Sequence, residues 1–381
     1  MTRRVVVLGA GAAGLSGANR LAVHQSRGVD LEVVLVERAG VHTFAPGFVG
    51  VLFGDVGPEA LCRPLGALVH PGVRLVQGEV TEIDPDASTV RGSFGALPYD
   101  ELVVALGAEV GWPEGPPPCG ELAPWTLEGA LAGREVLAHL DASARVVLAP
   151  ATPAYRCPPA VFDLAVRIRR ATGAKVKIVH PWSRPLAPFG EGPAEAFSAM
   201  LARAGVAFQG GFELAEVPDG RLVARSGAVV EYDVALVVPP HRPPPSVSSS
   251  PLAGPAGWPP VEFPRLSHPA YPNVAFVGDL AAPGLQAGMA GTLAVFEAAF
   301  VADRIAAAAA GRGAPAGPRL SAICFVDEGD TGSFLHCDFS GPAARTGPAS
   351  CVLMPPLPFF RAAKQLFAAE WFTTMLSGEV A

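Results

Sequence analysis

The chain has 381 residues, of which half are hydrophobic and 17% are charged, and its formal net charge is −7. This composition excludes a disordered chain, and a negative charge without any run of lysine or arginine excludes nucleic acid as an expected partner. The length exceeds what one ordinary core accommodates, so we expect two α/β domains and a short tail.

The first residues and the number of cysteines indicate the cellular compartment of the protein. An expected strand begins at Val5, which leaves no room for the apolar region of a signal peptide. No apolar run reaches the roughly 18 to 20 residues of a membrane-spanning helix. Six cysteines in such a chain do not predict a disulfide scaffold, so any that pair are expected to do redox chemistry. We expect a protein at the cytoplasmic face or peripheral to the membrane.

Apolar runs of strand length alternate with helical periodicity along the chain. Strands are expected at residues 5–8, 31–36, 73–77, 102–106, 146–148, 176–179, 234–238 and 274–277. Helices are expected at residues 15–23, 160–170 and 195–204. This alternation predicts the α/β class with buried parallel strands. Two stretches rich in proline and glycine, residues 239–260 and 311–318, are interpreted as connecting segments.

The first strand, turn and helix carry a nucleotide-binding signature. Residues 9–14 read GAGAAG, a GxGxxG pattern, and Glu37 closes the next strand. Gly9 permits the turn, Gly11 lets a pyrophosphate approach the backbone, and Gly14 lets the helix pack against the strand. Glu37 would accept the ribose hydroxyls, and its charge disfavours a 2′-phosphate. The unit predicts a bound dinucleotide.

Two later segments favour FAD over NAD. Residues 273–279 form an expected strand that ends in Gly-Asp, and residues 99–107 read YDELVVALG. Both resemble segments of flavoproteins with two dinucleotide-binding folds, in which the aspartate binds the ribityl chain of FAD and the next helix points its N-terminus at the flavin. The candidate cofactor-binding residues are Gly9, Gly11, Ala12, Ala13, Gly14, Glu37, Arg38, Ala105, Gly107, Gly278, Asp279 and Gly288.

The second half lacks the corresponding glycine turn. The expected strand 146–148 continues into residues 149–153, which read APATP. Side chains and prolines there would obstruct the close approach of a pyrophosphate, so NAD(P)H is disfavoured as the electron donor. Cys157 stands there instead, before a helix whose positive end would lower the pKa of the thiol.

Residues 155–160, YRCPPA, make the resemblance specific. With the FAD segments and the order of parts, they resemble sulfide:quinone oxidoreductases and the flavoprotein subunit of flavocytochrome c sulfide dehydrogenase, over most of the chain. The resemblance implies that a late cysteine pairs with Cys157 beside the flavin. Cys324 is the preferred partner and Cys337 is the alternative. Sulfide would open this disulfide to a persulfide, and two electrons would pass through FAD to a quinone.

The remaining cysteines receive separate interpretations. Some family members use a third catalytic cysteine, for which Cys119 is the candidate, although Trp125 stands nearer to the expected place. Cys62 and Cys351 are interpreted as structural.

The chain also departs from the family. Asp163 stands where members carry a glutamate, and Gln286 stands where they carry a lysine near the flavin. Proton handling and the identity of the acceptor therefore stay open. Three histidines could carry protons, and they are His42, His180 and His268. For each one singly, a packing or surface role is expected.

Residues 358–378 predict an amphipathic helix rich in aromatic residues. The corresponding segment of the family lies in the membrane interface beside the quinone pocket, which implies peripheral membrane contact. Packing in a dimer or in the core is the alternative. If the helix contacts the membrane, an isoprenoid quinone site would be lined by Phe325, Phe334 and Phe359.

The expected architecture is two Rossmann-like domains with a C-terminal region. The FAD-binding domain would comprise residues 1–108 and 240–312, the second domain residues 109–239, and the redox-cysteine and membrane-contact region residues 313–381. A flavoprotein that donates to cytochrome c and a catalytically altered FAD-binding partner or sensor are the alternative functions. Homo-oligomerisation, covalent attachment of FAD and the length of the sulfur product stay open.

Overall fold

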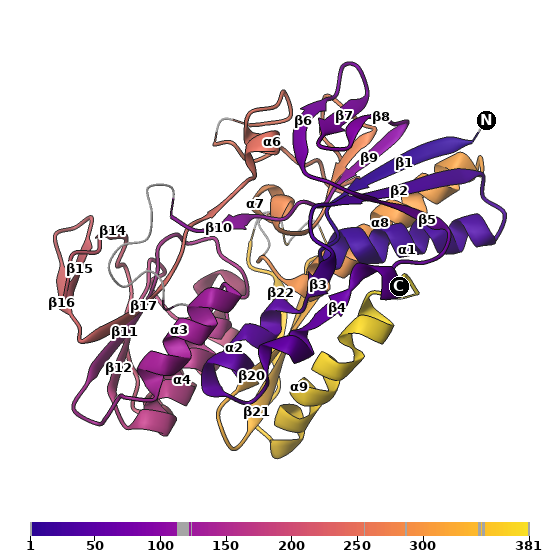
Figure 1. The fold of residues 1–381 in the computed structure, drawn as a ribbon. Helices are drawn as coiled ribbons and strands as arrows, with labels where there is room; N and C mark the ends of the chain where they lie inside the picture. The colour runs from indigo at the N-terminus through magenta and orange to yellow at the C-terminus, as the bar shows by residue number, and fades with distance from the viewer. Residues whose placement is uncertain are drawn as a thin grey trace.

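Two parallel sheets and a C-terminal antiparallel sheet form the frame of the molecule (Figure 1). The computed structural model describes residues 2–379 apart from residues 113–121, 123, 255, 286–287, 342–343 and 345–346. Cys119 and Gln286, two residues interpreted above, lie outside the described residues.

The first parallel sheet has the order β19-β9-β1-β2-β5. Its strands are β1 (Arg3–Leu8), β2 (Leu31–Glu37), β5 (Val73–Gln77), β9 (Glu101–Val104) and β19 (Val274–Phe276). The apolar side chains from Val5 to Leu8 are fully buried, as a central strand covered on both faces requires. Helices α1 (Ala12–Ser26) and α8 (Gly291–Ala309) pack against each other along this sheet (Figure 1).

The second parallel sheet has the order β13-β12-β11-β17. Its strands are β11 (Arg145–Pro150), β12 (Lys175–Val179), β13 (Ala207–Gln209) and β17 (Val234–Val238). The associated helices are α3 (Leu127–Leu137), α4 (Ala160–Thr172) and α5 (Glu191–Ala204). Helix α4 follows directly after Cys157, so the second sheet positions that residue.

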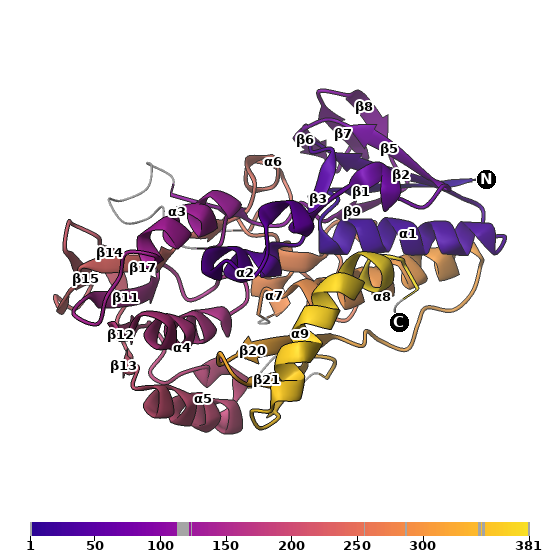
Figure 2. The same ribbon diagram turned by 60° about the horizontal axis from the view of Figure 1, so that its bottom comes forward.

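The C-terminal sheet has the order β20-β21-β22. It consists of β20 (Ser321–Asp327), β21 (Gly332–Asp338) and β22 (Ser350–Leu353), and α9 (Pro358–Glu370) packs on β20 and β21. Figure 2 shows α9 running from this sheet toward α8 and α1. A π-helical turn (Trp371–Met375) follows, and the buried Asn19 of α1 donates a hydrogen bond from Nδ2 to the Leu376 carbonyl at 2.7 Å.

The remaining elements are short. They are β3 (Val41–Thr43), α2 (Phe48–Phe53), β4 (Cys62–Pro64), β6 (Val80–Asp84), β7 (Thr89–Gly92), β8 (Gly95–Pro98), β10 (Glu109–Val110), β14 (Leu214–Glu216), β15 (Arg221–Ala224), β16 (Val229–Glu231), β18 (His241–Arg242), α6 (Pro245–Ser248) and α7 (Ala282–Leu285). Strands β10 and β18 pair antiparallel where the chain crosses between the two parallel sheets.

The α/β class with two Rossmann-like sheets is confirmed. The last residue of each expected strand lies within two residues of the last residue of an observed strand. The segment 239–260, interpreted as a connection, also contains β18 and α6. The C-terminal sheet was not expected from the sequence, because much of β20 is only half-buried and polar residues interrupt β21. Among the described residues, no helix combines the length and apolar character that crossing a membrane requires.

Candidate active site

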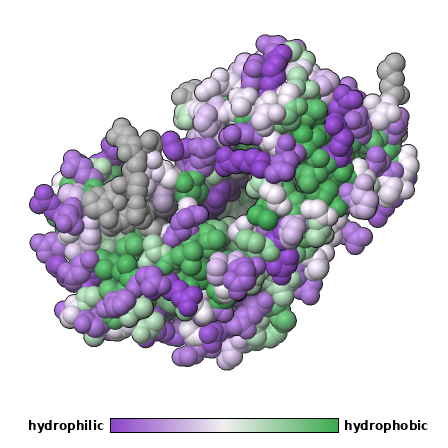
Figure 3. Space-filling view, in the orientation of Figure 1, coloured by the Kyte–Doolittle hydropathy of each residue, from purple (hydrophilic) through white to green (hydrophobic). Residues whose placement is uncertain are grey.

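A cavity of about 1400 Å³ lies where the two parallel sheets meet the C-terminal sheet. Its walls come from the turn after β1, the end of β19, the start of α4, and β20 and α9. Figure 3 shows the molecule hollowed between its two parts, with hydrophilic residues along the rim. The volume exceeds the roughly 300–1000 Å³ of ordinary small-molecule pockets and suits a ligand as large as a dinucleotide.

The glycine turn has the shape that a pyrophosphate requires. Gly9 has a φ of +91°, a conformation that L side chains rarely adopt, and a Cβ on Gly14 would lie 1.8 Å from the Gly9 carbonyl oxygen. A Cβ on Gly11 would meet no atom within 4 Å, so that side of the turn is open. Gly11 caps α1, whose free N–H groups and dipole favour a phosphate.

Glu37 holds this turn in place from the end of β2. Its Oε2 accepts a hydrogen bond from the Ala10 N–H at 2.6 Å, and its Oε1 accepts one from the Ala39 N–H at 2.8 Å. Each carboxylate oxygen keeps a further lone pair, and the side chain lines the cavity. Glu37 can therefore fix the turn and still accept a ribose hydroxyl.

Asp279 lies across the cavity and pairs with an arginine that the sequence analysis did not single out. Arg156 Nε donates to Asp279 Oδ2 at 2.5 Å, and its Nη2 donates to the Ala108 carbonyl at 2.6 Å. Gly278 has a φ of +72°, and its N–H donates to the buried Glu297. The salt bridge thus connects Arg156, the neighbour of Cys157, to the end of β19. Only its place in the Arg-Cys-Pro-Pro motif could have indicated a role for Arg156.

The other expected cofactor residues surround the same space. Gly14 lies behind the turn, and Arg38 is exposed, with its guanidinium 3.6 Å from Glu79. The long helix α8 begins only at Gly291, so the helix directly after Gly278 and Asp279 is the short α7. The expected residues that line the cavity are Gly9, Gly11, Ala12, Ala13, Glu37, Arg38, Ala105, Gly107, Gly278, Asp279 and Gly288.

Cys157 and Cys324 face each other at the cavity wall, with their Sγ atoms 3.8 Å apart. Cys157 has a φ of +51°, an uncommon conformation for a residue with a side chain and one that concentrates at functional sites. Its N–H donates to the Met289 carbonyl at 2.7 Å, and its own carbonyl accepts from Ala160 at the start of α4. Two segments far apart in the chain thus bring two thiols together.

The two thiols differ in acidity. The hydrogen bond from Cys324 lowers the pKa of Cys157, burial opposes this, and the charge of Lys364 lowers it further. The same hydrogen bond, together with burial, raises the pKa of Cys324 well above its ordinary value. Cys157 is therefore the more acidic thiol of the pair.

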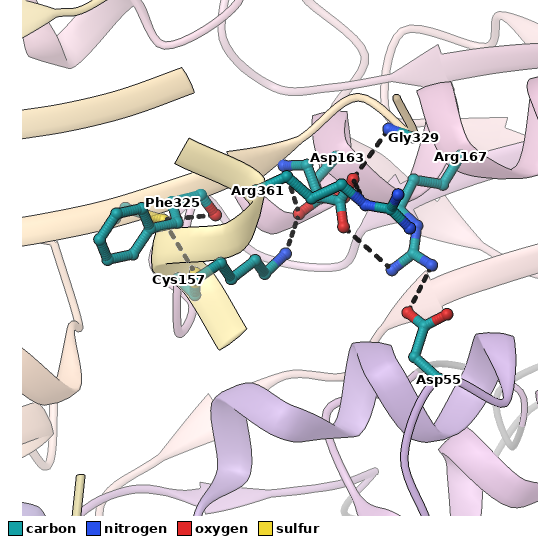
Figure 4. Close-up of polar contacts among 10 residues, drawn as sticks. Asp55, Cys157, Asp163, Arg167, Phe325, Gly329 and Arg361 are labelled. Carbon is teal, nitrogen blue, oxygen red and sulfur yellow. Dashed lines mark hydrogen bonds and ion pairs between the residues drawn. The ribbon is translucent and has the colours of Figure 1, made fainter. Parts of the chain in front are cut away.

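A network of buried charges flanks the cysteines (Figure 4). Asp163 Oδ2 accepts hydrogen bonds from Lys364 Nζ at 2.9 Å and from the Asp327 N–H at 3.2 Å. Its Oδ1 is buried without a hydrogen-bond partner among the described residues. Burial raises the pKa of Asp163, and Lys364 lowers it. Arg167 extends the network to Asp55 at 2.6 Å.

The alternative partner for Cys157, Cys337, has a different partner in the structure. Cys337 is joined by a disulfide to Cys351 on the neighbouring strand. Cys351, interpreted as structural, is therefore half of a second cysteine pair. Cys62 is a free thiol 3.5 Å from the Thr43 hydroxyl.

The histidines are buried in packing roles. The Ala10 carbonyl accepts from His42 Nδ1, Trp371 donates to its Nε2, and burial lowers its pKa. His180 is fully buried, and the ring of His268 lies tilted against that of Tyr271, with centroids 5.2 Å apart.

The aromatic residues expected at a quinone site do not all lie in the cavity. Phe325 lines the cavity and contacts Phe334 and Phe367, with ring centroids 5.2 and 5.7 Å apart. Phe359 instead points to solvent and is 68% exposed.

The second glycine turn is missing from the structure as well. Strand β11 continues through Pro150, and the Ala151 N–H still donates to the Val238 carbonyl of β17. The place where a nicotinamide dinucleotide would turn is thus occupied by extended backbone.

Two Rossmann-type sheets, a glycine turn with its acid, and a thiol pair in one cavity define a flavoprotein with two dinucleotide-binding folds. Residues 3–148 match the Pyridine nucleotide-disulphide oxidoreductase family, and the chain is similar to sulfide:quinone oxidoreductases. FAD is its cofactor. The glycine turn, Glu37 and Asp279 are the residues that would hold it.

Relatives of known name agree with this placement. The chain is 28% identical over 299 residues to the mitochondrial sulfide:quinone oxidoreductase of Mus musculus, a match that covers 72% of this chain and 65% of the relative. It is 27% identical over 353 residues to the type II NADH:quinone oxidoreductase Ndh of Mycobacterium tuberculosis, covering 81% and 73%. The chain thus spans somewhat less than two thirds of the mouse relative.

A solved structure shares the fold. The sulfide:quinone oxidoreductase of Aquifex aeolicus superposes with a TM-score of 0.84 at 21% identity, over 99% of this chain and 92% of that one.

Proposed function

We propose that the chain oxidises sulfide, or a related small sulfur nucleophile, and passes two electrons through FAD to a quinone. The observation that carries this proposal is the thiol pair of Cys157 and Cys324, whose Sγ atoms lie 3.8 Å apart in the wall of the nucleotide cavity. FAD, when bound, supplies the two-electron acceptor for this pair.

The reaction begins from the oxidised pair. Sulfide attacks Sγ of Cys324, the bond between the two cysteines breaks, and Cys157 leaves as a thiolate. The direction follows from the lowered pKa of Cys157, because a thiol of lower pKa leaves faster. Cys324 then carries a persulfide. A second sulfide can take the outer sulfur of the persulfide, which frees the thiol of Cys324. Re-formation of the Cys157–Cys324 disulfide then releases two electrons, for which FAD, when bound, would be the acceptor.

Two charged side chains support this step. Lys364 stabilises the thiolate of Cys157 electrostatically. Asp163 presents the buried, unpartnered Oδ1 at the cavity, and its raised pKa suits a group that takes up the proton of the incoming sulfide. Asp163 would thus take the role in proton handling that the sequence left open.

The acceptor side of the proposal rests on α9. The rings of Phe325, Phe367 and Trp371 follow one another at centroid distances of 5.7 and 5.8 Å along the cavity wall. Such a wall suits a quinone ring. The exposed apolar side chains nearby suit contact with a lipid surface, and they are Val352, Met354, Leu357, Phe359 and Leu366.

NADH is the second candidate donor, because the chain is similar to type II NADH:quinone oxidoreductases. The segment from Ala149 to Pro153, which has no glycine, opposes it.

One experiment separates the two donors. FAD-loaded protein is mixed anaerobically with sulfide or with NADH while the flavin absorbance is recorded. We expect bleaching by sulfide and none by NADH, and a Cys157→Ser variant that sulfide does not bleach. A Cys62→Ser variant is the control for loss of a thiol. Bleaching by NADH alone would overturn the proposal.

A further inference from the structure

A second cysteine pair lies on the same face of the C-terminal sheet as Cys324. Cys337 of β21 and Cys351 of β22 stand opposite each other and form a disulfide, with their Cα atoms 4.1 Å apart. Cys324 stands opposite Leu335, and Cys337 stands opposite Ala322. Opposite residues of an antiparallel pair, and residues two apart on a strand, project from one face. Cys324 and Cys337 are therefore diagonal neighbours.

The separation of these neighbours suits a bridge with one additional sulfur atom. Diagonal residues lie roughly 7–8 Å apart, whereas a direct disulfide needs Cα atoms within about 7 Å. One more sulfur lengthens the bridge by an S–S bond of about 2 Å. Both Cys324 and Cys337 line the cavity. A persulfide on Cys324 can thus bridge to Cys337, whereas the shorter thiolate of Cys324 cannot.

The wall around the two cysteines is apolar. Ala322, Leu335 and Phe339 line the cavity on the same face of the sheet, and the ring of Phe339 lies 6.5 Å from that of Phe189. Cys337 is only 2% exposed. Soft, polarisable sulfur atoms are stable in such surroundings.

We propose that the Cys337–Cys351 disulfide is a second redox-active pair that accepts sulfur from Cys324. The inference rests on the proposed function, because it starts from the Cys324 persulfide. The outer sulfur attacks Sγ of Cys337, the bond to Cys351 breaks, and a trisulfide joins Cys324 to Cys337. The Cys157 thiolate then attacks Sγ of Cys324. The Cys157–Cys324 disulfide re-forms, and Cys337 keeps the persulfide.

The exchange is balanced within the protein. Two sulfur–sulfur bonds and two negative charges are present before and after it, and the second thiolate moves from Cys157 to Cys351. No outside oxidant is needed, and each step can reverse. The second pair therefore holds one sulfur atom on Cys337. The first pair is meanwhile oxidised again and can react with another sulfide.

The test counts sulfur atoms on each cysteine. FAD-loaded protein with both pairs oxidised receives increasing sulfide anaerobically without a quinone, is quenched with an alkylating reagent, and is mapped by peptide mass. We expect one additional sulfur on the Cys337 peptide and alkylated Cys351. Uptake should be about two sulfides per chain, against about one in the Cys337→Ser, Cys351→Ser double variant. In Cys324→Ser, which keeps the second disulfide, Cys337 should gain no sulfur.

The outcomes separate this inference from the proposed function. A persulfide on Cys324 with an intact Cys337–Cys351 disulfide at every sulfide concentration would make that disulfide a structural clamp only and overturn the inference alone. Sulfur on Cys337 in the Cys324→Ser variant would also overturn it. Absence of a persulfide on both Cys157 and Cys324, with an unbleached flavin, would overturn the proposed function and the inference with it.

Discussion

Nζ of Lys364 lies 2.9 Å from Oδ2 of Asp163, a contact that joins helix α9 to helix α4 across 201 residues of sequence. Both side chains act on the thiol pair, since Lys364 lowers the pKa of Cys157 and Asp163 raises it. The position of α9 therefore sets the charge at the redox cysteines.

Replacing Lys364 tests this electrostatic role. In Lys364→Met we expect the pKa of Cys157 to rise, because burial still opposes ionisation and the nearby cation is gone. The curve of Cys157 alkylation rate against pH, measured on the reduced protein, should move to higher pH. Lys364→Arg keeps the cation and should leave the curve close to that of the wild type. A curve that does not move in Lys364→Met would contradict the assignment.

Replacing Glu37 tests the nucleotide site. Glu37→Gln places an NH₂ group against the N–H of Ala10 or Ala39, because the carboxylate accepts from both. We expect FAD affinity to fall about tenfold, which corresponds to about 1.4 kcal/mol. Titration of the flavin-free protein with FAD measures this. Glu32→Gln, on the same strand but paired with Arg4 at the surface, should bind FAD normally. Equal affinities in both variants would count against the role of Glu37.

His180 predicts a loss of stability in acid. The Trp182 N–H donates to His180 Nδ1 at 3.1 Å, so Nε2 carries the hydrogen and donates to the Tyr155 hydroxyl at 2.9 Å. Burial lowers the pKa of His180 to about 3. Between pH 6.5 and 3 the unfolded chain binds a proton that the folded chain does not, so stability falls as pH falls.

Urea unfolding at a series of pH values measures this effect. The contribution of one histidine is at most about 1.4 kcal/mol per pH unit. A His180→Gln variant should be less stable at pH 7 and lose less stability on acidification than the wild type. Parallel curves for the two proteins would refute a titrating His180.

The exposed apolar residues of α9 predict membrane binding. Phe359 and Leu366 are 68% and 67% exposed. The Phe359→Glu, Leu366→Glu double variant should partition onto liposomes at least about tenfold less than the wild type. Sedimentation with vesicles measures this, and Val229→Glu, at a similarly exposed site on β16, is the matched control. Equal sedimentation of all three proteins would show that α9 does not contact lipid.

Local patterns were sufficient to predict the nucleotide unit. The strand, turn and helix from Arg3 to Ser26 follow from a short apolar run and a GxGxxG turn, and both are read within one segment of the chain. Cys157 was found in the same way, because its position before α4 is local.

Contacts between distant segments could not be derived in this way. The pairing of Arg156 with Asp279 and that of Cys337 with Cys351 depend on how whole sheets pack. Lys364 lies in the amphipathic helix expected at residues 358–378, yet its ammonium points inward to Asp163. A residue with a long side chain at the edge of such a helix can face either way, and only its partner decides.

The hydrogen bond from Asn19 to the Leu376 carbonyl bears on biosynthesis. The two residues are 357 positions apart, so the amide of Asn19 has no such acceptor while the chain is being made. The nucleotide unit, both parallel sheets and Cys157 emerge before Lys364 does. A partly synthesised chain therefore carries Cys157 without the cation that lowers the pKa of its thiol. The contact of Lys364 that lowers the pKa of Cys157 therefore forms only when the last helix has docked.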